Sequence, residues 1–176
     1  MTQPSSFFHF NLRAFTRALW VLSVLVLAFG LTAVTFAQTP SPVAAGQALP
    51  ELKLKDQHDQ PWAVAPTTRL VMFAAGRKAS NLVQAVVQEL PQDQLTRRQA
   101  LYLADLSKMP GFITRTFALP ALKEMPYPIG VSLAEDTLAN WPRQPDAVTL
   151  IALENKVVKH IIYATTEAEL RAALTQ

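Results

Sequence analysis

The 176-residue sequence contains no cysteine. Disulfide exchange and thiol-dependent peroxide reduction both need an attacking thiolate, so both reactions are excluded for this chain. No disulfide can cross-link the fold either, and stability must therefore come from packing alone.

Glycine and histidine are also scarce. The five glycines form no Gly-x-Gly-x-x-Gly fingerprint, which makes flavin or nicotinamide chemistry a remote possibility. His9, His58 and His160 are widely separated, whereas a zinc site needs three or four ligands brought together. No Gly-x-Ser-x-Gly motif of a serine hydrolase is present. We therefore expect no metal and no cofactor.

The amino-terminal 37 residues have the pattern of an export segment. Arg13 and Arg17 precede an apolar run over residues 18–37, which ends in a small-residue site at 35–37. The run is near the bilayer-spanning length of about 20 residues and exceeds the roughly 7–15 of a cleaved signal core. A signal peptide and an amino-terminal membrane anchor both remain open. Both place the rest of the chain outside the cytoplasm, in the periplasm if the protein is bacterial.

The remainder divides into a Pro- and Ala-containing linker over residues 38–47 and one domain over residues 48–176. With the two leader arginines set aside, 14 basic residues stand against 13 acidic ones. This balance predicts no concentrated basic face, so we expect no nucleic-acid partner. We expect membrane contact only through residues 18–37, if that segment is retained.

Residues 70–90 are the centre of the predicted domain. An unbroken apolar run over 70–75 predicts a buried strand, and apolar residues at helical spacing then predict a helix from about Ser80 to Leu90. Gly76 marks the turn between the two. Pro91 ends the helix.

The rest of the domain is predicted as alternating strands and helices. The expected strands are 49–55 paired with 62–64, 100–106, 126–133, and a hairpin of 148–153 with 157–163. A helix is expected within residues 107–124, broken at Pro120. We predict that its inner face carries Phe112, Ile113, Thr116, Phe117 and Leu119. A last helix begins at a capping box of Thr166 and Glu169, while residues 138–144 show no decisive pattern.

Three segments resemble a known family: residues 49–52 (Leu-Pro-Glu-Leu), 73–77 (Phe-Ala-Ala-Gly-Arg) and 104–110 (Ala-Asp-Leu-Ser-Lys-Met-Pro). Across residues 46–176 the chain resembles thioredoxin-like exported proteins, and more closely the cysteine-free YtfJ-like periplasmic proteins. The resemblance implies an α/β thioredoxin-like sandwich, a central mixed sheet flanked by helices with an amino-terminal hairpin. In redox-active relatives the paired cysteines would fall near Lys78 and Asn81, and a cis-proline near Pro145.

The predicted turn before the 80–90 helix is the candidate site. Unpaired backbone N–H groups and the helix dipole favour an anion there, although two basic side chains on a solvated turn would have the same pattern. We expect Asp105 beside the same crevice, in a structural ion pair with Arg77 or Lys78 rather than as a catalytic base. The candidate residues are Gly76, Arg77, Lys78, Ser80, Asp105 and Pro145.

Two function classes follow. The leading one is a non-catalytic binding module of the cell envelope that recognises an envelope protein or a small anionic ligand at this crevice. The second is an enzyme that uses the crevice without thiols. Most aromatic residues near the second helix are expected in the core, but Trp141 is a candidate for a recognition surface.

Overall fold

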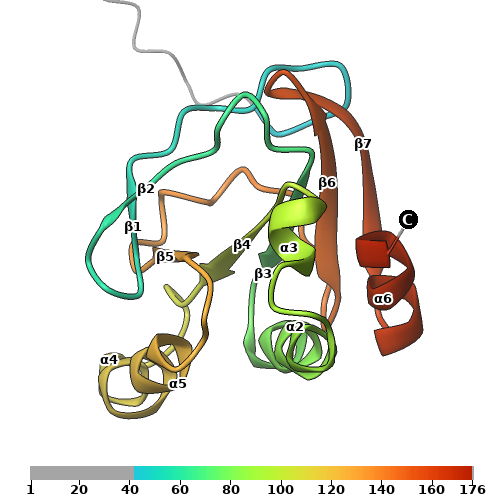
Figure 1. Cartoon of the computed structure of the whole chain (residues 1–176). Helices are drawn as coiled ribbons and strands as arrows, with labels where there is room; N and C mark the ends of the chain where they lie inside the picture. Colours follow the sequence, from blue (N-terminus) through green and yellow to red (C-terminus); the bar gives the residue numbers. More distant parts are fainter. Residues whose placement is uncertain (1–41, 176) are drawn as a thin grey trace, which may run out of the picture. The chain divides into compact units, whose positions relative to one another are not determined.

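The computed structural model describes residues 42–175, and the predicted leader lies outside them. A seven-stranded mixed sheet forms the centre, in the order β2-β1-β5-β4-β3-β6-β7 (Figure 1). β3 (Leu70–Ala74), β4 (Ala100–Asp105) and β5 (Ile129–Ser132) are parallel. β6 (Val148–Glu154) and β7 (Val157–Ala164) extend the sheet antiparallel on one side. β1 (Leu54–Asp56) and β2 (Pro61–Trp62) do so on the other.

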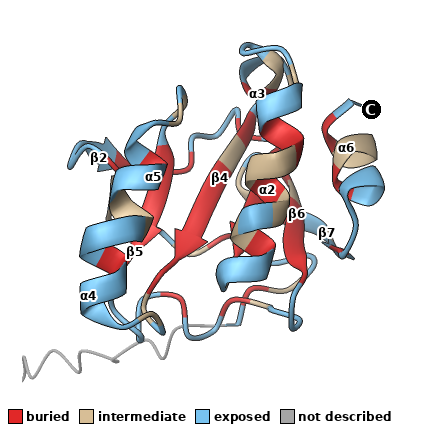
Figure 2. Ribbon diagram, turned by 90° about the horizontal axis from the view of Figure 1, so that it is seen from below, coloured by how far each residue is buried: buried red, intermediate tan, exposed pale blue. Residues whose placement is uncertain are grey.

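Burial on both faces explains the unbroken apolar runs of the central strands. In β3, Leu70 and Met72 pack into the core on one face, whereas Val71 and Phe73 pack into the core on the other. A strand covered on both sides needs apolar residues at consecutive positions rather than alternating ones. The buried colouring of β4 and β6 in Figure 2 follows from this.

The two faces are covered differently. Helices α2 (Arg77–Glu89), α3 (Gln94–Arg97), α5 (Leu119–Lys123) and α6 (Glu167–Thr175) all contribute buried residues to one core cluster. On the opposite face, irregular segments supply Val43, Leu49, Leu138 and Trp141. The described part of the predicted linker therefore packs on the domain, and Gly46 and Leu49 donate backbone hydrogen bonds to β7 and its turn at 2.7 Å.

Most predicted elements are confirmed, with shorter bounds for the amino-terminal hairpin. The β6–β7 turn has Asn155 and Lys156 at φ 49° and 64°, which suits a two-residue hairpin loop. The capping box is present: the Glu169 amide donates to the Thr166 hydroxyl, and the Thr166 amide donates to the Glu169 carboxylate. Hydrogen bonds from the Thr165 amide and, to a smaller extent, the Thr166 amide to the Glu169 carboxylate lower the pKa of Glu169. The short helix α3, in a stretch predicted as polar loop, was missed.

The helix predicted within residues 107–124 is present, but the prediction of which side chains face the core is wrong. It consists of α4 (Gly111–Ile113), a π-helical turn η1 (Thr114–Ala118) and α5, with Pro120 tolerated in the first turn of α5. Thr114 and Leu122 are the buried residues, while Phe112 and Phe117 are 69% and 60% exposed. The wider π turn changes which side chains face the sheet, so the expected inner face with Phe112, Ile113, Thr116 and Phe117 lies outside the core.

Trp141 is likewise not on a recognition surface. It is 4% exposed, and its ring meets that of Phe73 edge to face at 5.3 Å between centroids. The segment that sequence patterns left undecided is therefore part of the core on the face without helices.

Among residues 42–175, no helix is long and apolar enough to cross a membrane.

Candidate functional site

The candidate crevice is a hollow of about 220 Å³ where β3 and β4 end. It is lined by Ala75, Gly76, Arg77, Asp105, Lys108, Met109 and Arg143. Three of the predicted site residues thus lie together, although they come from different parts of the chain. Parallel strands place their carboxyl ends at the same edge of a sheet, which is why Gly76 and Asp105 meet there.

Gly76 shapes the first wall of the hollow. Its backbone lies at φ 139° and ψ 169°, a region open essentially to glycine alone. This sharp turn lets α2 begin at Arg77, three residues before the predicted start. Ser80 is therefore not the cap; its amide already donates the first helical hydrogen bond to the Gly76 carbonyl at 3.0 Å.

The Asp105 carboxylate does not pair with Arg77 or Lys78, as had been expected. Its side chain is 3% exposed and accepts a hydrogen bond from Arg143 Nη1 at 3.0 Å. Its other oxygen accepts from the Ser107 amide at 3.0 Å. The expected structural ion pair exists, but its cation comes from 38 residues along the chain.

Arg143 is the site residue that sequence reasoning missed. Its guanidinium lies 5.3 Å from the centre of the Phe73 ring and also donates to the Leu138 and Trp141 carbonyls. It therefore ties the irregular segment 138–143 to the ends of β3 and β4. In the sequence, only its position directly after Trp141 and Pro142 distinguishes it from other arginines.

Lys78 is not among the residues that line the hollow. Its Nζ lies 2.7 Å from Asp146 Oδ2, with both side chains largely exposed. Lys108 is similarly paired with Glu135 at 2.7 Å. No ion pair within residues 42–175 involves Arg77, so its charge is not compensated by a direct partner.

Pro145 lies in a loop beside this region but not in the lining of the hollow. No peptide bond in residues 42–175 is cis, so Pro145 lacks the cis peptide bond that redox-active relatives would have near this position. The Ala147 amide donates to the Gln144 carbonyl, and Asp146 has φ 61°. Pro145 therefore occupies the second position of a type II turn, where a trans proline is favoured.

Ser80 lines a second, larger hollow that shares Arg77 and Met109 with the first. Beneath Ser80, burial raises the pKa of Tyr102 to about 12, an effect that Ser80 partly offsets. The Tyr102 hydroxyl is buried without a hydrogen bond of ordinary geometry. With that pKa the Tyr102 hydroxyl remains protonated at neutral pH. We therefore assign Tyr102 a structural role.

No group of three or more potential metal ligands occurs within the described part of the chain. The charged groups at the hollow are therefore three cations, Arg77, Lys108 and Arg143, and the Asp105 carboxylate, which already accepts two hydrogen bonds. This arrangement suits the binding of an anion by charge-assisted hydrogen bonds.

Comparison with known proteins supports the fold. No protein-family model and no curated protein sequence matches the chain. Among solved structures, a protein assigned as a disulfide isomerase from Bacteroides thetaiotaomicron matches with a TM-score of 0.51 and 12% identity, over 77% of this chain and 91% of that one. The fold is thioredoxin-like.

Two further structures are similar. A conserved protein of unknown function from Bacteroides fragilis matches with a TM-score of 0.50 and 17% identity, over 75% of this chain and 99% of that one. A peroxidoxin from Mycobacterium tuberculosis matches with a TM-score of 0.47 and 14% identity, over 74% and 95%. The two matches with TM-scores of 0.51 and 0.50, at 12% and 17% identity, show the architecture and not the activity.

Proposed function

We propose that this chain is an exported, non-catalytic thioredoxin-fold binding protein of the cell envelope, similar to the cysteine-free YtfJ-like proteins. It recognises an anionic group, on a partner protein or a small ligand, at the hollow formed by Arg77, Lys108 and Arg143. The absence of cysteine removes the thiol chemistry of the fold while leaving this crevice intact.

The charge of Arg77, which has no ion-pair partner among residues 42–175, is the observation that carries the proposal. Lys108 and Arg143 are paired with Glu135 and Asp105, so they contribute positive potential but have carboxylates of their own. Arg77 is exposed at the mouth and can donate two parallel hydrogen bonds to an incoming carboxylate or phosphate.

The alternative of a thiol-free enzyme gains no comparable support. Asp105 is the carboxylate that a general base at this crevice would require. It accepts hydrogen bonds from Arg143 and Ser107 and is held in place by both. We therefore assign it a structural role.

Partner capture with a matched pair of variants tests this proposal. Full-length protein is crosslinked in the envelope, the partners are identified, and their affinities are measured for the wild type, R77A and R97A. Arg97 is an exposed arginine on α3, paired with Asp93 and distant from the lining of the hollow. R77A should weaken binding roughly tenfold or more, the value of one charge-assisted contact.

Folding should change little in either variant, within about 0.5 kcal/mol, because both side chains are exposed. K78A should weaken binding less than R77A, since Lys78 is held by Asp146 outside the hollow. Equal affinity of R77A and wild type for every captured partner would refute a recognition role for the crevice.

A further inference from the structure

The larger hollow is an apolar groove between α2 and the α4–η1–α5 segment. Its volume is about 460 Å³, within the roughly 300–1,000 Å³ of small-molecule sites. Leu106, Met109 and Leu122 lie in its lining, together with Ile113, Phe117, Ala118 and Ala121 from the segment opposite α2. The two helical walls are seen nearly end on in Figure 1.

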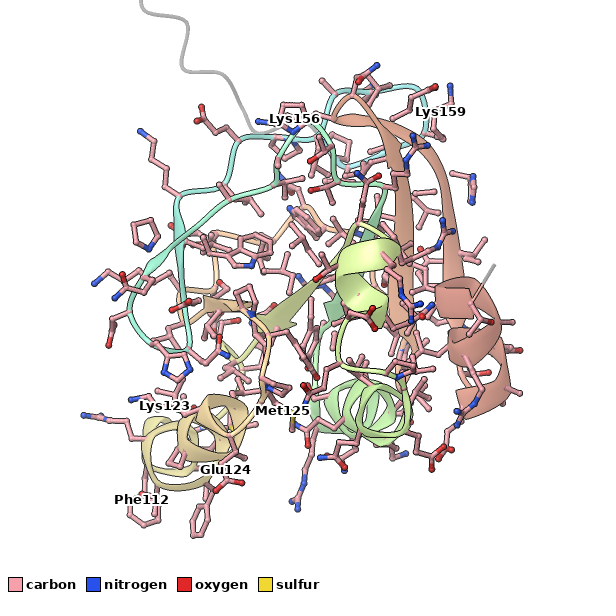
Figure 3. All side chains as sticks on the ribbon, viewed as in Figure 1. Phe112, Lys123, Glu124, Met125, Lys156 and Lys159 are labelled. Atoms are coloured by element: carbon pink, nitrogen blue, oxygen red, sulfur yellow. The ribbon has the colours of Figure 1, made fainter. Side chains whose placement is uncertain are left out.

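Large apolar side chains are exposed along this groove. Phe117 lines it, and the Phe117 ring contacts that of Phe112 edge to face at 6.3 Å between centroids. Figure 3 shows Phe112 projecting outward from α4. Phe117 lies in the π turn and Phe112 in α4 just before it, and π turns occur frequently at functional sites. Exposed apolar clusters of this kind mark binding surfaces.

The charges of the groove select the ligand. Arg77 is the charged residue in its lining, Ser80, Asn81 and Gln84 are neutral, and no carboxylate is present. Arg77 also lines the adjoining cationic hollow. A complementary ligand is therefore apolar along its length and negatively charged at one end.

The volume and the distribution of polar groups favour a single acyl chain over a peptide. A two-turn helix, about 10 Å across and about 11 Å long, would need roughly twice the groove's volume to be enclosed. An extended peptide would bring backbone groups that need partners. The residues that line the wall opposite α2 offer it only apolar side chains: Ile113, Phe117, Ala118, Ala121 and Leu122.

We propose that this groove binds a long-chain carboxylate, with the acyl chain between α2 and α5 and the carboxylate at the Arg77 guanidinium. The inference rests on the proposed function, because Arg77 is shared, but it specifies the class of ligand. The acyl chain gains burial against Leu106, Leu122 and Phe117, and the carboxylate accepts hydrogen bonds from Arg77.

Calorimetric titration of the full-length protein with sodium dodecanoate, below the micelle concentration, tests the proposal. The wild type should bind saturably at one site. R77Q should weaken binding roughly tenfold, and F117S should weaken it by a similar factor. The matched controls R97Q and L133S change an exposed arginine and an exposed leucine outside the groove, and they should bind like the wild type. Because every protein carries the same amino-terminal residues, differences among them report on the groove.

The same titration with dodecanol, which has the same chain length but no carboxylate, tests the role of the charge. Dodecanol should bind more weakly than dodecanoate, and R77Q should not change its affinity. Absence of saturable dodecanoate binding to the wild type, or binding of dodecanoate by R77Q and F117S with the same affinity as the wild type, would overturn the acyl-carboxylate proposal. An acidic helical peptide that binds where dodecanoate does not would do the same. In each of those cases, selective loss of envelope partners by R77A would leave the proposed binding function standing.

Discussion

At the scale of single residues, the Asp105–Arg143 pair is the main electrostatic feature of the site. Asp105 is almost fully buried, whereas the Arg143 side chain is 34% exposed. Loss of the arginine would leave a buried carboxylate with one remaining donor, the Ser107 amide. Loss of the aspartate would leave a guanidinium that water can still reach. Loss of Arg143 should therefore lower the free energy of unfolding more than loss of Asp105.

A double-mutant cycle measures this inequality. R143M keeps an unbranched apolar side chain but removes the guanidinium that lies over Phe73 and pairs with Asp105, and it should cost about 3 kcal/mol in the free energy of unfolding. D105N should cost less, about 1–2 kcal/mol, because Arg143 is partly solvated. The double variant should be more stable than the sum of the single effects implies. Chemical denaturation provides all four values, and strictly additive effects would contradict a direct interaction.

At the scale of elements, the turn from β3 to α2 depends on Gly76. A Cβ placed there would meet no atom within 4 Å, so space does not require glycine. The backbone does, because φ 139° with ψ 169° is strained for any other residue. The site is thus built on a local conformation rather than on close packing.

Substitution of this glycine gives the second stability test. G76A should lower the free energy of unfolding by about 1–3 kcal/mol, entirely from backbone strain. G111A is the matched control: Gly111 begins α4 without a positive φ, and the atom nearest its Cβ position is the flexible end of Arg115 at 3.4 Å. G111A should be neutral or slightly stabilising. Equal effects in the two variants would show that strain at Gly76 is not the reason for the glycine.

At the scale of the whole molecule, residues 42–175 form a domain whose sheet is buried on both faces without any disulfide. Helices cover one face and irregular segments the other. The candidate crevice and the apolar groove lie next to each other, since they share Arg77 and Met109. One ligand can therefore use both.

The proposed location of this domain depends on residues 1–37, which the structure does not describe. A reporter active only outside the cytoplasm, fused after Gln176, should be active, because basic residues such as Arg13 and Arg17 before an apolar segment favour an amino terminus that stays inside. Amino-terminal sequencing of the mature protein should start near Gln38 if the leader is cleaved. Activity of a cytoplasm-only reporter in the same fusion position would contradict the export proposal.

Sequence alone determined the features that depend on neighbouring residues. The apolar runs of β3, β4 and β6, the β6–β7 hairpin and the capping box at Thr166 could all be predicted, because each rests on local periodicity or on hydrogen bonds within four residues. The absence of cysteine excluded thiol chemistry with no structural knowledge.

Tertiary structure decided which residues meet. Asp105 pairs with Arg143 across 38 residues, and Lys78 with Asp146 across 68, and no local pattern encodes partners at such distances. Phe112 in α4 and Phe117 in the π turn at Thr114–Ala118 are exposed, while Trp141 is buried against Phe73. Hydrophobicity is the same in both environments, so only the packing of whole elements determines which aromatic residues form the core and which remain available for a ligand.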